Sequence, residues 1–147
     1  MGLYNFQARF VPKILSGEKT HTIRANRINA DKPGSTLHLY TGLRTKKARL
    51  LMRVPCLRVD EISISLAPEN LPFDDAARVF VAIDGTVLHR SECETLARRD
   101  GFDNFDEMLK FWDGRLPFYG RIVYWRFGVG EIQNEQTDVR QVPACVM

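Results

Sequence analysis

Cysteine is scarce in this 147-residue sequence, and its few copies are poorly placed for crosslinks or metal sites. The three cysteines, Cys56, Cys93 and Cys145, are odd in number and form no CxxC pair. This argues against a disulfide scaffold and against a zinc site built on paired cysteines. His21 and His38 add no recognised zinc spacing, so we interpret them as hydrogen-bonded sheet residues and expect neither a metal nor a cofactor.

Long apolar runs are absent as well. No segment approaches the roughly 18 consecutive apolar residues that a membrane span requires. The first ten residues lack the apolar stretch of a secretory signal peptide. We therefore expect no membrane association, and the reducing cytoplasm is the expected compartment.

What is present is an ordinary globular composition, with 44% hydrophobic and 27% charged residues. A chain of this length can bury roughly 68–70% of its surface as one domain, without disulfide or metal staples. We expect a single domain over residues 1–128. Residues 129–147 are polar and follow no periodic pattern, which predicts a flexible C-terminal tail.

The small net charge of +3 conceals a strong asymmetry along the chain. Residues 1–58 carry 12 Lys and Arg against 2 acidic residues, whereas residues 59–147 carry 9 against 16. The first half therefore predicts a surface that faces a polyanion such as nucleic acid. The alternative is that the two halves neutralise each other across the fold.

Alternation of apolar and polar residues predicts about six strands. The strand signals span residues 3–10, 19–24, 35–41, 48–66, 79–89 and 118–127. Within 79–89, Asp84-Gly85 separates two apolar runs and predicts a tight hairpin turn.

Two or three short helices are predicted between these strands. The first follows Pro12 and stops at Gly17, and the second spans 91–99 with Ser91 and Glu94 as a capping box. The third spans 105–112, with Asn104 as its cap. Helices this short and irregularly placed favour an α+β fold in which a small barrel-like sheet has helices packed outside.

Residues 17–24, GEKTHTIR, resemble the GxKxxTxR signature of the ASCH superfamily, whose members are relatives of PUA domains. Residues 33–39, PGSTLHL, resemble the family's turn and strand. Residues 97–102, ARRDGF, and the helix after them resemble the element that caps the family's barrel. With a closing strand at 119–127, the resemblance covers residues 3–127.

The resemblance implies a PUA-like barrel of five to six strands, with a cleft between the barrel and a helix. It also implies a modified nucleoside or single-stranded RNA as partner. One branch, the small bacterial N(4)-acetylcytidine amidohydrolases, removes an acetyl group from the cytosine amine with a Lys, a Thr and a Glu. Another branch has been reported to cut RNA.

Carried onto this chain, the resemblance makes Thr22 the nucleophile and Lys19 the base and then the acid. A Thr hydroxyl needs such a base, and burial or a neighbouring cation can lower the pKa of a Lys toward that role. Asp100 aligns with the family's Glu but is one methylene shorter, so its reach to the pair is in question. In a regular strand, residues three apart also face opposite sides, so Lys19 and Thr22 meet only if the chain bends. Without the resemblance, Lys19 would be interpreted as a solvated lysine at a strand start.

A basic group is the candidate substrate-binding or RNA-binding surface, because guanidinium groups grip phosphate and stack on bases. Its members are Arg24, Arg27, Arg44, Lys46, Lys47 and Arg49. Tyr40 lies between its two clusters and could stack on an unpaired base. Three functions stay open: an amidohydrolase, a non-catalytic RNA-binding module, and a metal-independent ribonuclease that uses Tyr40 and Lys46.

Overall fold

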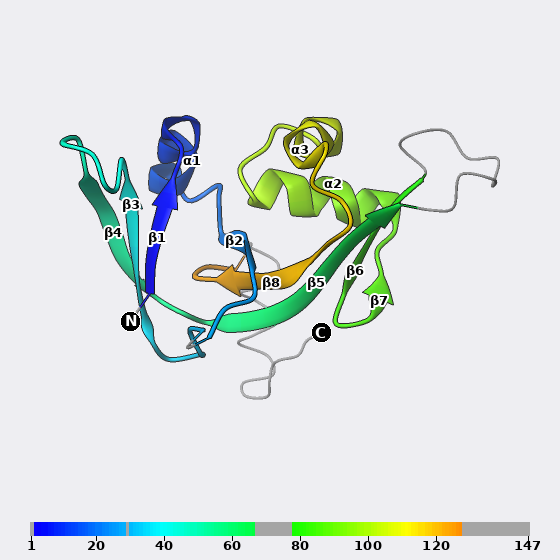
Figure 1. Cartoon of the computed structure of the whole chain (residues 1–147), viewed down its shortest axis with the longest axis horizontal. Coiled ribbons are helices and arrows are strands. Elements are labelled where there is room, and N and C mark those ends of the chain that lie inside the picture. Colours follow the sequence, from blue (N-terminus) through cyan, green and yellow to red (C-terminus); the bar gives the residue numbers. More distant parts are fainter. Residues whose placement is uncertain (1, 29, 67–77, 128–147) are drawn as a thin grey trace.

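The computed structural model describes residues 2–28, 30–66 and 78–127, which form an α+β arrangement of two sheets and short helices (Figure 1). The strands are β1 (Gly2–Phe6), β2 (His21–Ala25), β3 (Thr36–Thr41), β4 (Arg49–Pro55), β5 (Arg58–Leu66), β6 (Val79–Ile83), β7 (Thr86–Val87) and β8 (Phe118–Tyr124). The helices are the 3-10 turn η1 (Ala8–Phe10), α1 (Val11–Ser16), α2 (Arg90–Arg99) and α3 (Phe105–Trp112). The expected α+β class is confirmed, and the expected tail at 129–147 lies outside the described residues.

The strands divide between a three-stranded sheet, in the order β1-β3-β4, and a five-stranded sheet, in the order β2-β8-β5-β6-β7. Strand β1 runs parallel to β3, and every other pairing is antiparallel. Among the described residues no backbone ladder joins the two sheets, so the expected closed barrel of five to six strands is wrong.

The physical reason lies partly in the expected strand 48–66, which is two strands rather than one. Pro55 ends β4, because proline cannot donate to a ladder. The next amide, at Cys56, still bonds the carbonyl of Ser35, but the amide of Leu57 bonds the carbonyl of Tyr124 on β8. The chain therefore leaves one sheet and enters the other within two residues.

The observed ends of the helices agree in part with those expected from the sequence. Gly17 ends α1 with φ +88°, a left-handed conformation that glycine adopts without strain. The Asn104 side chain accepts a hydrogen bond from the Glu107 amide, which confirms it as the cap of α3. The expected cap of α2 is wrong, because α2 begins at Arg90 and its capping box is formed by His89 and Glu92.

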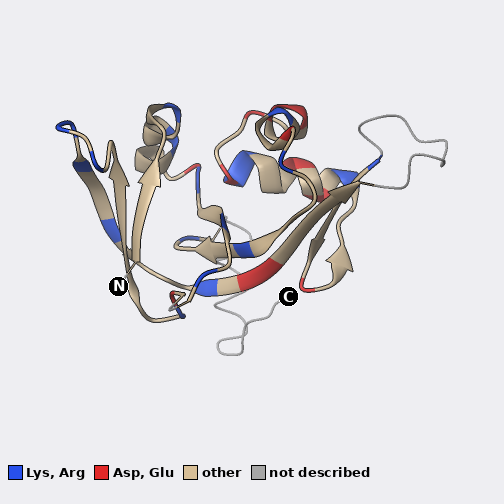
Figure 2. Cartoon of the chain, viewed as in Figure 1, with Lys and Arg blue, Asp and Glu red and all other residues tan. Residues whose placement is uncertain are grey.

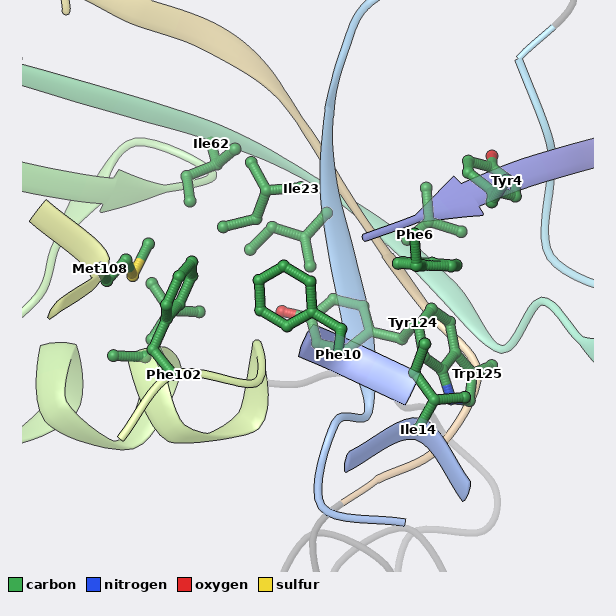
Figure 3. Packing of buried hydrophobic residues seen from close by; sticks show 14 of the residues in the cluster. Tyr4, Phe6, Phe10, Ile14, Ile23, Ile62, Phe102, Met108, Tyr124 and Trp125 are labelled. Carbon is green, nitrogen blue, oxygen red and sulfur yellow. The ribbon is translucent and has the colours of Figure 1, made fainter. Parts of the chain in front are cut away.

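The core joins the helices to both sheets through aromatic side chains (Figure 3). The rings of Phe10 and Phe102 meet edge to face with centroids 5.3 Å apart, and those of Phe6 and Trp125 do so at 5.9 Å. Such pairs add about 0.5–1.5 kcal/mol each beyond the area that they bury. The Phe10–Phe102 pair fixes η1 against the connection between α2 and α3, where the candidate site lies.

Candidate functional site

A cavity of about 400 Å³ opens between the end of β1, β2 and the α2–α3 connection. Three polar residues of its wall, Lys19, Thr22 and Asp100, are buried, with 3%, 4% and 6% of their surfaces exposed. This volume is near the lower end of the range for small-molecule sites. The cavity gathers all three expected catalytic residues, which come from segments about eighty positions apart in the sequence.

Lys19 and Asp100 form a buried ion pair at the closed end of the cavity. The Lys19 ammonium donates hydrogen bonds to the Asp100 main-chain oxygen and, at 2.9 Å, to Asp100 Oδ1. The shorter Asp side chain therefore does reach the lysine. The Lys19 ammonium also lies over the Phe10 ring at 5.1 Å, so it is a core residue rather than a solvated one.

Backbone contacts hold this pair in register. The Lys19 amide bonds the carbonyl of Lys13 in α1, and the Thr20 amide bonds the carbonyl of Arg99 at the end of α2. Asp100 follows directly as the C-cap of α2. Gly101 then takes φ +102°, and a Cβ there would stand 2.8 Å from Phe10 Cδ1 and 3.2 Å from Lys19 Cδ. Only glycine leaves room for the lysine stem at this point.

Burial moves the two pKa values of the pair toward each other. It lowers the pKa of Lys19 and raises the pKa of Asp100, because both charged forms lose their hydration. Each partner opposes the shift of the other, since opposite charges favour ionisation. The two groups therefore titrate as a coupled pair rather than as independent sites.

Thr22 is tied to Arg24 rather than to Lys19. The Arg24 Nε donates to Thr22 Oγ1 at 3.0 Å, and its Nη2 donates to the Asn5 main-chain oxygen at 2.9 Å. The objection that residues three apart face opposite sides does not apply, because β2 begins at His21 and Lys19 lies before it. Arg24 itself packs over the Tyr4 and Phe6 rings, and burial lowers its pKa.

His21 is a member of the site that the sequence interpretation missed. Its Nε2 lies 3.5 Å from Asp100 Oδ1 and has no hydrogen-bond partner among the described residues, so the expectation of a fully hydrogen-bonded histidine is wrong. Burial, and then the charge of Lys19, hold its pKa well below the ordinary value. A neutral His21 imidazole therefore lies next to the Asp100 carboxylate.

The remaining basic residues and Tyr40 do not line this cavity. Arg27 pairs with Asp31 at 3.2 Å and donates to the Tyr4 hydroxyl, so it serves the fold. Figure 2 shows a basic turn between β3 and β4, at the far end of the three-stranded sheet from β2. That turn carries Arg44, Lys46 and Lys47. Within the described ranges, no hydrogen bond or ring contact joins Tyr40, on β3, to Lys46.

The opposite wall of the cavity is aromatic, and the sequence interpretation assigned several of its members to the core. Its rings are those of Phe10, Phe102, Phe111, Trp112 and Phe118. The exposed Arg115 completes this wall, with its guanidinium 4.7 Å above the Phe111 ring. The one available signal was the density of aromatics in 102–118, which a packed core explains equally well.

Among the described residues, no three His, Cys, Asp or Glu side chains gather as a metal site. None of the helices in those ranges has the length and apolarity to span a bilayer. The cavity is therefore defined by one buried ion pair, one threonine and an aromatic wall. Comparisons of the chain with protein-family models, with curated proteins and with solved structures find no match.

Proposed function

We propose that this chain is an ASCH-type amidohydrolase that acts on an acylated nucleobase in the cavity of Lys19, Thr22 and Asp100. The observation that carries the proposal is the buried Lys19–Asp100 pair in the wall of a cavity that Thr22 also lines. A buried lysine with a carboxylate partner is costly to fold and is typical of a site that moves protons. The open arrangement of the two sheets departs from a closed PUA-like barrel. The proposal therefore rests on the residues of the cavity and not on the fold.

The reaction begins with Lys19 in its neutral form, the form that can accept a proton. Thr22 Oγ forms a bond to the amide carbonyl carbon as its proton passes to Lys19 Nζ. The C–N bond then breaks, and Lys19 returns the proton to the departing ring amine. Water attacks the resulting threonyl ester, giving its proton to Lys19, and the carboxylic acid leaves as Thr22 recovers its hydroxyl.

Arg24 supplies the electrostatic part of this scheme. Its Nε donates to Thr22 Oγ1, so it favours a partial negative charge on that oxygen as the proton leaves. A guanidinium held rigidly by Asn5 and two aromatic rings keeps its orientation during the reaction, which is the condition for strong transition-state stabilisation. Catalytic hydrogen bonds between Lys19 and Thr22 are expected to tighten only when substrate fills the cavity.

The decisive experiment follows N(4)-acetylcytidine by chromatography with and without EDTA. The wild-type protein should release cytidine in both conditions, and Thr22→Ala should slow release by about 10³-fold or more. Thr20→Ala is the matched control, because Thr20 is equally buried and lies outside this cavity. Undiminished release by Thr22→Ala would contradict the nucleophile.

A non-catalytic RNA-binding module is the second candidate, favoured by one observation. Arg44, Lys46 and Lys47 are in or next to an exposed turn, and no ion pair within the described ranges neutralises them. Such cations contact phosphates and make binding fall with salt. Intact acetylcytidine together with salt-dependent RNA binding would replace the hydrolase by this module.

A further inference from the structure

The cavity has a buried polar end and an exposed end, which gives any ligand a direction. Lys19, Thr22 and Asp100 occupy the buried end. Gln7 and Arg115 line the same cavity but are exposed, so they mark its mouth. A planar ligand ring that packs against the aromatic wall would therefore enter with its reacting amide first. Its opposite edge would then face Arg115.

Arg115 is the exposed cation among the residues that line this cavity, whereas Arg24 is partly buried and uses its donors on Thr22 and on the Asn5 main-chain oxygen. Lys19 pairs with Asp100, and Arg9 and Lys13 pair with acidic residues of the α2–α3 region. No carboxylate of the described residues lies within ion-pair distance of Arg115. Its guanidinium instead lies over the Phe111 ring, 4.7 Å from the ring centroid.

A guanidinium with unused donors suits a phosphate, which accepts two parallel hydrogen bonds from it. We propose that the substrate is a mononucleotide whose 5′-phosphate is held by Arg115 at the mouth, rather than a free nucleoside. This inference rests on the proposed function, because it takes the base to be the ring that enters the cavity. In a cytosine nucleotide the ribose and phosphate lie across the ring from the acylated amine, as the direction of the cavity requires.

The size of the site favours a monomer over a polymer. A volume of about 400 Å³ accommodates a small ligand. The exposed cations that would follow a longer chain, Lys46 and Lys47, belong to the β3–β4 turn instead.

Calorimetric titration with cytidine and with cytidine 5′-monophosphate, the two unreactive products, tests the inference directly. The wild-type protein should bind the monophosphate about tenfold more tightly than cytidine, and Arg115→Gln should abolish this preference. Arg115→Lys keeps the positive charge but loses the paired guanidinium donors, so it should retain part of the preference for the monophosphate. The matched control is Arg98→Gln, which removes an equally exposed arginine outside the cavity and should leave the preference intact.

Several results would overturn the inference. These are equal affinity for the two ligands, a preference that survives Arg115→Gln, or tighter binding of an RNA oligonucleotide that depends on Lys46 and Lys47. If acetylcytidine is hydrolysed but the monophosphate binds no more tightly than cytidine, the phosphate contact is wrong and the proposed hydrolase stands. If the phosphate preference depends on Arg115 but no acylated base is hydrolysed, the phosphate contact stands and the hydrolase fails.

Discussion

The amine of Lys19 is subject to two opposing influences, which makes its titration a direct test of the site. Burial lowers its pKa from 10.5, Asp100 raises it, and Arg24 adds to the lowering. In the proposed reaction the neutral amine is the base, so activity should rise with pH through the pKa of Lys19. Removing the carboxylate charge removes the raising influence, so the rise should then occur at lower pH.

We therefore expect the acidic limb of kcat/KM for N(4)-acetylcytidine to lie below pH 10.5 and to move further down in Asp100→Asn. Rates measured between about pH 5 and about pH 11 would show the shift. Asp103→Asn, at an exposed aspartate that pairs with Lys13, should leave the limb in place. A limb that stays fixed in Asp100→Asn would show that another group is the base.

At the level of elements, the carboxylate of Glu94 is one of the groups that join α2 to α3. Glu94 of α2 accepts a hydrogen bond from the Phe105 amide at the start of α3, at 2.9 Å. This bond, followed by the contribution of Arg90, lowers the pKa of Glu94 from its ordinary 4.5. A lowered folded-state pKa stabilises the protein above the unfolded value, and the stabilisation is lost as pH falls through the folded value.

Glu94→Gln should accordingly lower the Tm at neutral pH, since it removes the charge that strengthens this bond. The Tm difference from wild type should shrink as the pH falls below 4.5, where the wild-type carboxylate also loses its charge. Thermal unfolding followed by circular dichroism at several pH values measures this. Asp113→Asn removes an exposed carboxylate without a side-chain hydrogen bond and should show no such convergence. A pH-independent difference would refute the role given to the charge.

Elements with local signals were predictable from the sequence. Helix α3 was predicted at its observed bounds because Asn104 and the apolar stripe fall within nine residues. Asp84 and Gly85 both take positive φ, as a tight hairpin turn requires. The break between β4 and β5 was missed because the sequence is strand-like on both sides of Pro55, although the two strands pair with different partners, β3 and β8.

At the scale of the whole molecule, the candidate site combines local and distant information. Lys19, Thr22 and Arg24 lie within six positions and were found through one short pattern. The aromatic wall and Arg115 were not, because they come from η1, the α2–α3 connection, α3, the α3–β8 connection and the start of β8, which tertiary packing alone brings to β2. A sequence pattern identifies such a reactive centre more readily than the walls that select its substrate.

No ladder between the two sheets is found in the described part of the chain, and Arg24 is one of the side chains that bridge them. Through its bond to the Asn5 carbonyl it joins β2 of one sheet to β1 of the other. Arg24→Lys keeps the charge but loses the fork, so the free energy of unfolding should fall by about 1–3 kcal/mol. Urea denaturation measures the loss. Arg53→Lys, at an exposed position of β4, should change stability far less, and equal losses in both variants would contradict the bridge.

The same guanidinium spans the seam between the sheets and donates to the threonine in the cavity. A movement that separates the two sheets should therefore displace the Thr22 hydroxyl before any strand unfolds. On gentle heating, hydrolysis should fade while the circular dichroism spectrum still reports intact sheets. For the proposed hydrolysis, the turnover rate would then report how closely the two sheets are held together.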